Sequence, residues 1–140
     1  MKKNDFGYDQ VNRDEHYSKV QEVFNSVANE YDFMNDVMSF GFHRSWKKEF
    51  VGLIEINDEN DTKILDLAGG TGDIAKRILK SHPNTSIEII DKNFLMLKEC
   101  ITKDNVLKSN KINLICGDGE NIPLHDNSMD VITLSFGIRN

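Results

Sequence analysis

The residues with the most evident chemistry lie in the run ILDLAGGTGD, Ile64–Asp73. An apolar segment, Lys63–Leu67, carries one acid at Asp66 and ends in a glycine-rich turn over residues 68–72. Glycine adopts positive φ angles and lets a ligand approach the backbone closely. The helix predicted from Asp73 would offer N–H groups beside such a ligand. This order of strand, turn and helix predicts a nucleotide-type binding site.

Further polar groups follow three other predicted strands. Asp91 follows the second strand, Asp118 and Gly119 follow the third, and Ser135 ends the fourth. Ligands of open α/β sheets bind beyond the carboxyl ends of the strands, so these groups would meet the glycine turn in one crevice. A carboxylate at Asp91 can accept both hydroxyls of a ribose. Asp118 could accept an adenine amino group, with room for the ring at Gly119.

Other interpretations of these residues stay open. Gly70–Ala75 also satisfies G-x-G-x-x-A, and Asp91 lies about 20 residues further on, as in nicotinamide dinucleotide enzymes. A glycine turn can also simply pack a helix on a strand, and Asp118 can be an ordinary turn aspartate. Asp91 therefore indicates a nucleoside without naming it.

Alternating strands and helices from Lys63 onward must position these groups. The predicted strands are Lys63–Leu67, Ser86–Ile90, Ile112–Cys116 and Asp130–Leu134. One helix is predicted over about Asp73–Ser81, and Asn93 can cap another that holds Leu97, Cys100 and Ile101 on one side. This pattern predicts an α/β fold with a doubly wound parallel sheet. The fourth strand would be an apolar edge, so we expect the front part of a domain.

The N-terminal part has a different pattern. Residues 1–14 are polar and predicted to be a loose tail, and residues 15–56 form a helical segment. A helix from about His43 to Ile54 would place Trp46, Phe50, Leu53 and Ile54 on one face. The Phe- and Met-rich stretch from Phe33 to Phe42 is either helix core against the sheet or the wall of a lid over a flexible apolar ligand.

Composition restricts the class of protein. A net charge of −6 argues against nucleic acid as the main partner. No apolar run approaches the roughly 20 residues of a membrane span, and the N-terminus has no apolar core of a secretory signal. Cys100 and Cys116 lie in apolar contexts and are expected to be buried thiols in a reducing cytoplasm. No Cys/His cluster has the spacing of a metal site.

The chain resembles the ubiquinone/menaquinone biosynthesis C-methyltransferase family, within the S-adenosylmethionine-dependent class I methyltransferases. Besides ILDLAGGTGD, the runs that carry the resemblance are VFNSVANEYDFMNDVMSFGFHRSWKK (Val23–Lys48), IIDKNFLML (Ile89–Leu97), GDGENIPLHDNSMDVIT (Gly117–Thr133) and LSFGIRN (Leu134–Asn140). The resemblance implies a Rossmann-like fold, with a helical lid segment over residues 15–56 and an S-adenosylmethionine-binding half over 57–140. Ala68 stands at the first glycine position of the general motif, and Gly119 is a mild variation on the family pattern.

The resemblance also implies roles for individual residues. Thr71 with Gly70 and Gly72 would hold the methionine part of S-adenosyl-L-methionine. Asp91 would take the ribose hydroxyls, Asp118 and Gly119 would contact the adenine, and Ser135 would lie near the sulfonium. No role for a metal ion is implied.

The implied reaction is methylation of a ring carbon of a polyprenylated benzoquinol or demethylmenaquinol. Ionising a neighbouring phenol makes that carbon nucleophilic, so the site must align the reacting atoms, stabilise a phenolate and accept a proton. Arg139 is the candidate for the phenolate, Asn140 for orienting a ring oxygen and Tyr31 for covering the ring. His43 is a possible base, although a helix-start histidine bonded to backbone is the simpler interpretation.

The expected setting follows from the substrate. We expect a cytoplasmic protein that contacts the inner face of the membrane transiently, with a homodimer or a completing chain covering the edge of the fourth strand. Two alternatives stay open. One is a non-catalytic or split S-adenosylmethionine-binding fragment. The other, a nicotinamide oxidoreductase, explains only Gly70–Ala75 and Asp91.

Overall fold

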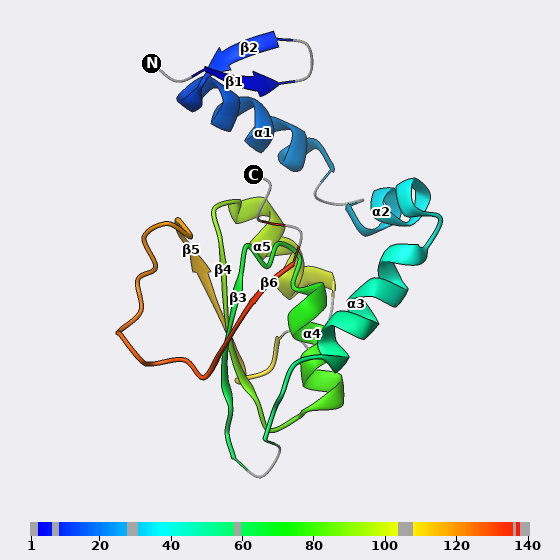
Figure 1. Cartoon of the computed structure of the whole chain (residues 1–140), viewed down its shortest axis with the longest axis vertical. Helices are drawn as coiled ribbons and strands as arrows, with labels where there is room; N and C mark the ends of the chain where they lie inside the picture. Colours follow the sequence, from blue (N-terminus) through cyan, green and yellow to red (C-terminus); the bar gives the residue numbers. More distant parts are fainter. Residues whose placement is uncertain are drawn as a thin grey trace.

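The computed structural model describes residues 3–6, 9–27, 31–57, 60–103, 108–135 and 137 (Figure 1). An N-terminal hairpin and three helices precede an alternating β/α region. The elements in chain order are β1 (Lys3–Phe6), β2 (Asp9–Asn12), α1 (Arg13–Val27), α2 (Tyr31–Ser39), α3 (Phe42–Gly52), β3 (Lys63–Leu67), α4 (Asp73–Ser81), β4 (Ser86–Asp91), α5 (Phe94–Lys103), β5 (Ile112–Cys116) and β6 (Val131–Leu134).

The main sheet is parallel, with the strand order β5-β4-β3-β6. Leu67 at the end of β3 pairs with Ile90 on one side and with Leu134 on the other. The carboxyl ends of the strands therefore reach the same edge of the sheet. The predicted strands are confirmed to within one residue, because β4 runs on to Asp91 and β6 begins at Val131.

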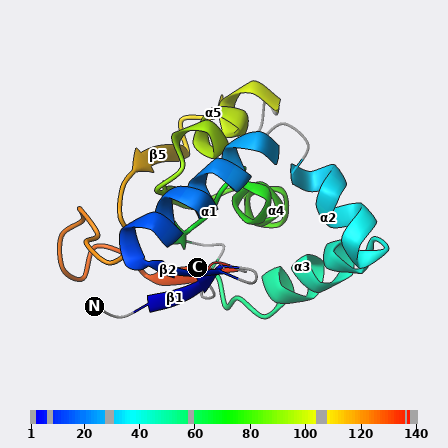
Figure 2. The same cartoon turned by 90° about the horizontal axis from the view of Figure 1, so that it is seen from above.

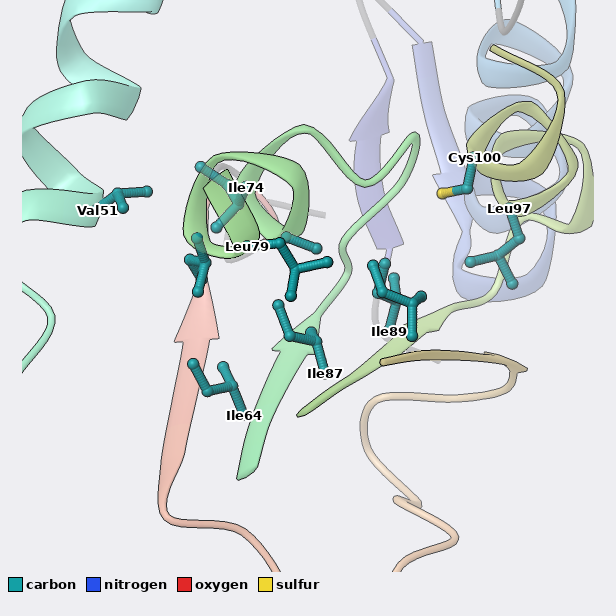
Figure 3. Close-up of a cluster of buried hydrophobic side chains, with 11 residues drawn as sticks. Val51, Ile64, Ile74, Leu79, Ile87, Ile89, Leu97 and Cys100 are labelled. Carbon is teal, nitrogen blue, oxygen red and sulfur yellow. The ribbon is translucent and has the colours of Figure 1, made fainter. Parts of the chain in front are cut away.

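The core lies between this sheet and α4 (Figure 3). Alternate strand residues point to one face of a sheet, so Ile64, Ile87 and Ile89 all reach the helix side, and each is at most 1% exposed. The facing side of α4 supplies Ile74, Ala75, Ile78 and Leu79 at helical spacing, all buried. This packing fixes where α4 begins and therefore where the glycine turn must lie.

Helix α5 begins as the sequence predicts, with Asn93 as its cap. The Asn93 Oδ1 accepts the N–H groups of Leu95 and Met96, at 3.0 and 3.1 Å. Leu97 and Cys100 are buried, but Ile101 is 45% exposed, because the buried side of α5 runs through Met96, Leu97 and Cys100 instead.

Helices α3, α4 and α5 gather on one side of the sheet, and α1 lies over the edge where its strands end (Figures 1 and 2). A hydrogen bond of 2.9 Å from the Asn93 Nδ2 to the Asn25 Oδ1 joins α1 to the turn that precedes α5. The N-terminal segment thus extends over the side of the sheet where the sequence predicts a ligand.

The N-terminal residues differ from the loose tail expected over residues 1–14. Lys3–Phe6 pairs antiparallel with Asp9–Asn12, and α1 begins at Arg13 immediately after this hairpin. The hydrogen bonds of such a ladder come from the backbone, so polar strands of four residues leave little periodic signal in the sequence.

The predicted buried face of α3 is wrong in part. Phe50 and Ile54 pack against the core, but Trp46 and Leu53 are 54% and 77% exposed. The buried positions of the helix are His43, Lys47 and Val51. Two of these are polar and have partners: the Ser39 hydroxyl for His43 and the Asp73 carboxylate for Lys47. A hydrophobic pattern alone does not find a buried face that is held by hydrogen bonds and an ion pair.

The two cysteines differ in environment. Cys100 is buried as expected, and its Sγ lies 3.2 Å from the Gly70 carbonyl oxygen as a donor. Cys116 is exposed at the end of β5, which corrects the expectation that both thiols are buried. Within the described residues, no helix combines the length and the apolar character needed to cross a membrane.

Candidate functional site

The glycine turn after β3 has an unusual backbone. Ala68, Gly70 and Gly72 have φ angles of +54°, +54° and +76°, all in the left-handed region. Glycine adopts this region without strain, whereas Ala68 carries a Cβ there. The Gly69 N–H donates to the Ile90 carbonyl at 3.2 Å, which ties the turn to the end of β4. The turn is thus fixed in place at the carboxyl edge of the sheet.

Asp91 is the group that joins this turn to the next one. Its Oδ2 accepts the Gly70 N–H at 2.9 Å, and its Oδ1 accepts the Asn93 N–H at 2.7 Å. Burial raises the pKa of the Asp91 carboxyl, and the two N–H groups oppose that rise by favouring the ionised form. A Cβ on Gly70 would lie 3.3 Å from the Met96 Cε, so the turn is packed closely behind Asp91.

The loop that carries Asp118 adjoins Asp91, because the Gly117 N–H donates to the Asp91 carbonyl at 3.0 Å. Both of its carboxylate oxygens already have partners. Oδ2 lies 2.7 Å from the Lys92 Nζ, and Oδ1 accepts the Glu120 N–H at 3.0 Å. A nucleobase such as adenine that hydrogen-bonds to the Asp118 carboxylate would compete with Lys92 for it. Sequence reasoning missed Lys92, although a cation directly after the predicted ribose acid is a visible signal.

Gly119 packs tightly against Leu67 at the end of β3. A Cβ added to Gly119 would lie 3.2 Å from the Leu67 Cδ1, so the glycine keeps this loop close to the end of the strand. The loop after β5 is therefore fixed against the same strand end from which the glycine turn departs.

Asp66 is a second residue that sequence reasoning left without a role. It is 1% exposed, and its Oδ1 accepts the Thr133 hydroxyl at 2.8 Å. Its Oδ2 is buried and has no hydrogen-bond partner within the described part of the chain. Burial raises the pKa of Asp66 to about 7, against the opposing effect of the Thr133 hydroxyl. The sequence feature that could have identified Asp66 as a functional residue is its place as the one acid in an apolar strand.

Thr71 and Ser135 both lie near the carboxyl edge of the sheet. Thr71 is 9% exposed within the glycine turn. Ser135 follows β6 directly and lines a cleft of about 240 Å³ between that strand end and α3. The other residues of this α3–β6 cleft are Trp46, Lys47, Phe50 and Leu134.

The predicted catalytic residues are not all described. Arg139 and Asn140 lie outside the described residues, and Tyr31 begins α2 with a side chain that is also outside them. His43 is buried, with its Nδ1 2.9 Å from the Ser39 Oγ and its backbone N–H donating to the same oxygen at 3.3 Å. Its partner is thus a side chain rather than backbone. Over the described ranges, no group of three His, Cys, Asp or Glu could hold a metal ion.

Residues 10–140 match the model of the ubiE/COQ5 methyltransferase family. The chain belongs to this family. It is 42% identical to a Caenorhabditis elegans protein named 2-methoxy-6-polyprenyl-1,4-benzoquinol methylase, mitochondrial, over 99% of this chain and 49% of the relative. It is also 42% identical to a ubiquinone/menaquinone biosynthesis C-methyltransferase of Methylobacterium nodulans, over 97% of this chain and 54% of the relative. The chain thus spans about half the length of these curated relatives.

Solved structures resemble the fold. One chain in the complex between the Haloferax volcanii Trm112 methyltransferase activator and a methyltransferase matches with a TM-score of 0.61 and 16% identity, over 79% of this chain and 46% of the other. A methyltransferase of Geobacter sulfurreducens, solved with S-adenosyl-L-homocysteine, matches with a TM-score of 0.51 and 19% identity, over 65% and 36%. The class I methyltransferase fold predicted from the sequence is confirmed.

The packing behind the turn predicts that Gly69→Ala destabilises the protein. The added Cβ would lie 2.6 Å from the Ile89 Cγ2 and 2.8 Å from the Asp66 Oδ2, both buried. Overpacking of this kind costs about 1–3 kcal/mol in unfolding free energy, measured by urea denaturation. Gly52→Ala is the control, because a Cβ there meets nothing within 4 Å, and we expect it to be neutral or slightly stabilising. Equal stability of the two variants would contradict the tight packing.

The burial of Asp66 predicts a distinctive pH dependence of stability. Its folded pKa of about 7 exceeds the ordinary 3.8, so its stabilising contribution is complete below pH 3.8 and is lost as the pH rises through 7. The loss has a slope of up to about 1.4 kcal/mol per pH unit in that window. Asp66→Asn keeps an acceptor for Thr133 and removes the ionisation. In urea titrations, we expect the stability of the variant relative to wild type to rise between about pH 4 and 7 and to level off above pH 7.

Exposed Asp126→Asn is the matched control for this pH series and should follow the wild-type profile. Parallel curves for Asp66→Asn and wild type across the whole range would show that Asp66 ionises in the folded protein as it does in the unfolded chain.

Proposed function

We propose that this chain supplies the S-adenosyl-L-methionine-binding half of a C-methyltransferase. The observation that carries the proposal is the Asp91 carboxylate, fixed by the Gly70 and Asn93 N–H groups at the carboxyl edge of the sheet. Each carboxylate oxygen has a further lone pair, so Asp91 can accept the two hydroxyls of a ribose while keeping both backbone bonds. Membership of a methyltransferase family supports this nucleoside over a nicotinamide dinucleotide.

The other residues of the edge fit the same cofactor. The Asp66 Oδ2, which has no hydrogen-bond partner among the described residues, offers a buried acceptor behind the glycine turn, which suits an ammonium group of the methionine part. Positive φ angles at Gly70 and Gly72 bring backbone, without side chains, to the place where Thr71 and its neighbours would hold that part. Asp118 and Gly119 would contact the adenine, with Lys92 moving aside, and Ser135 would lie near the sulfonium.

The proposed acceptor is the ring of a polyprenylated quinol, either a benzoquinol or a demethylmenaquinol. Support comes from the curated relatives, one named for a polyprenyl benzoquinol and another for ubiquinone and menaquinone biosynthesis. When bound, S-adenosyl-L-methionine supplies an electrophilic methyl group. The chain must hold the ring in line with that group and stabilise the phenolate that makes the ring carbon nucleophilic. Arg139, Asn140 and Tyr31 are proposed for these roles at the ring.

The long apolar tail of such a quinol needs a separate surface. Helix α2 and the turn after it expose large apolar side chains: Phe33, Val37, Met38 and Phe40 are 64%, 55%, 77% and 91% exposed. This exposure supports the lid interpretation of the Phe- and Met-rich stretch over the core interpretation. We propose that this face meets the isoprenoid tail, in a cytoplasmic protein that touches the membrane surface transiently.

A second candidate function is a split S-adenosylmethionine-binding fragment that needs another chain. It is favoured by β6, which pairs only with β3 among the described strands and leaves Ile132 62% exposed on the sheet edge. An apolar strand edge of this kind is normally paired or covered.

Affinity for S-adenosyl-L-homocysteine, measured by isothermal titration calorimetry, tests the proposed cofactor. Asp91→Asn removes the charge that accepts the ribose hydroxyls, and charged hydrogen bonds contribute about 1.5–3 kcal/mol, so affinity should fall roughly 10- to 150-fold. The control is Asp126→Asn, an exposed loop acid expected to bind as wild type does. If wild type binds NAD at least as tightly as S-adenosyl-L-homocysteine, the proposed cofactor is wrong.

Methyl transfer distinguishes the enzyme from the split fragment. A longer protein that contains these 140 residues and has the length of the curated relatives should transfer labelled methyl groups from S-adenosyl-L-methionine to a demethylated quinol. The split-fragment alternative predicts that the 140-residue chain binds the cofactor but transfers no methyl group alone. Turnover by the purified 140-residue monomer would eliminate that alternative, and no turnover by either form would contradict the proposed reaction.

A further inference from the structure

The α3–β6 cleft has the size of an aromatic ring. Its volume is about 240 Å³, and a protein cavity of about 150 Å³ accommodates benzene. Ser135 lines it and directly follows β6, whose Leu134 pairs with Leu67 of β3. Leu67 is the residue from which the glycine turn departs. An occupant of the cleft would therefore lie next to the proposed cofactor site.

The lining of the cleft suits a ring that bears an oxygen anion. Trp46, Phe50 and Leu134 supply apolar and aromatic walls, against which a flat ring can stack. Among the described lining residues, Lys47 has the charged side chain, and Ser135 and the Trp46 indole carry further hydrogen-bond donors. A buried ammonium beside aromatic walls attracts an ionised oxygen much more strongly than an exposed lysine does, because water screens it less.

The charges around Lys47 leave room for an anion. The Lys47 side chain is only 8% exposed, and its Nζ lies 2.8 Å from the Asp73 Oδ2. The same carboxylate also binds the Arg77 Nε, at 3.2 Å. Although burial alone would raise the pKa of Asp73, the two cations hold it below its ordinary value. Asp73 thus serves two cations. Asp36 also interacts with Lys47 but is itself paired with Arg44, so these five side chains together carry a net positive charge.

We propose that the α3–β6 cleft receives the hydroxylated ring of the acceptor and that Lys47 binds its phenolate oxygen. The inference rests on the proposed function and deepens it. It adds Lys47 as a second cation for the phenolate, beside the proposed Arg139. The phenol releases its proton to solvent as its oxygen binds. Arg77 keeps its bond to Asp73 when Lys47 turns toward the ring.

A purely structural role for Lys47 makes a different prediction. In that case the ion pair with Asp73 only attaches α3 to the start of α4, and removing either partner should have the same effect on the cleft. If Lys47 binds the phenolate, the two substitutions differ. Lys47→Met removes the binding cation, whereas Asp73→Asn removes its competitor.

The test measures binding of 4-nitrophenolate, with neutral 4-nitroanisole as the uncharged probe, by quenching of tryptophan fluorescence. Trp46 is the one tryptophan of the chain and lies in the wall of the cleft, so quenching reports on this place. We expect Lys47→Met to weaken binding of the phenolate at least tenfold and to change binding of nitroanisole less than twofold. Lys47→Arg should retain most of the phenolate affinity.

Two controls complete the design. The neighbouring exposed Lys48→Met should bind the phenolate within twofold of wild type. Asp73→Asn should bind it at least as tightly as wild type. Equal weakening by Lys47→Met and Asp73→Asn, or equal losses for phenolate and nitroanisole in Lys47→Met, would overturn the inference.

Titration of the same variants with S-adenosyl-L-homocysteine separates this inference from the proposed function. Normal cofactor binding without a Lys47-dependent phenolate signal would contradict the inference alone. A Lys47-dependent signal in a protein that does not bind S-adenosyl-L-homocysteine would contradict the proposed function and leave the anion-binding cleft in place.

Discussion

The site depends on one carboxylate with two backbone donors. Asp91 ends β4, and its oxygens accept N–H groups from the glycine turn after β3 and from the residue that caps α5. Its own carbonyl accepts the Gly117 N–H from the loop after β5. Three connections that are distant in sequence are thus joined at one residue. Parallel register makes this possible, because it brings the ends of β3, β4 and β5 to the same edge of the sheet. The cost is a half-buried acid with a raised pKa.

Buried charge recurs around this edge, and it is placed where a ligand can use it. Asp66 is buried beneath the turn, and one of its oxygens has no hydrogen bond within the part of the chain that the structure describes. Lys47 is buried at the wall of the α3–β6 cleft. An unsatisfied buried polar atom costs about 1–3 kcal/mol, so such groups reduce stability unless a ligand completes their bonding. The apolar core around Ile64, Ile78 and Ile89 supplies the compensating stability from residues that take no part in binding. The middle of the strands thus supplies the packing, and the ends of the strands carry the groups proposed to bind the ligand.

Much of this arrangement could be predicted from the sequence, and the exceptions share a physical cause. Local patterns predict the strands of the main sheet, the helices α4 and α5 and the Asn93 cap. The geometry of parallel sheets predicts that Asp91 meets the glycine turn. The buried face of α3 does not, because Lys47 is buried by an ion pair with Asp73 that no periodicity reveals. The Lys92–Asp118 pair and the bonding of Asp66 to Thr133 are likewise contacts between side chains of different elements. The N-terminal hairpin is held by backbone hydrogen bonds, and its polar side chains give no pattern from which it could be predicted.

The central claim is that the carboxyl edge around Asp91 binds S-adenosyl-L-methionine, and backbone amide NMR tests it most directly. On titration with S-adenosyl-L-homocysteine, the amide signals of Gly70 and Asn93 should shift most, because both N–H groups bond to the carboxylate that would take the ribose. Amides of Lys63 and Ser86, at the amino ends of β3 and β4 beside a second cleft of about 240 Å³, should stay unchanged. Shifts concentrated at Lys63 and Ser86, or none at Gly70 and Asn93 with saturating ligand, would contradict the account.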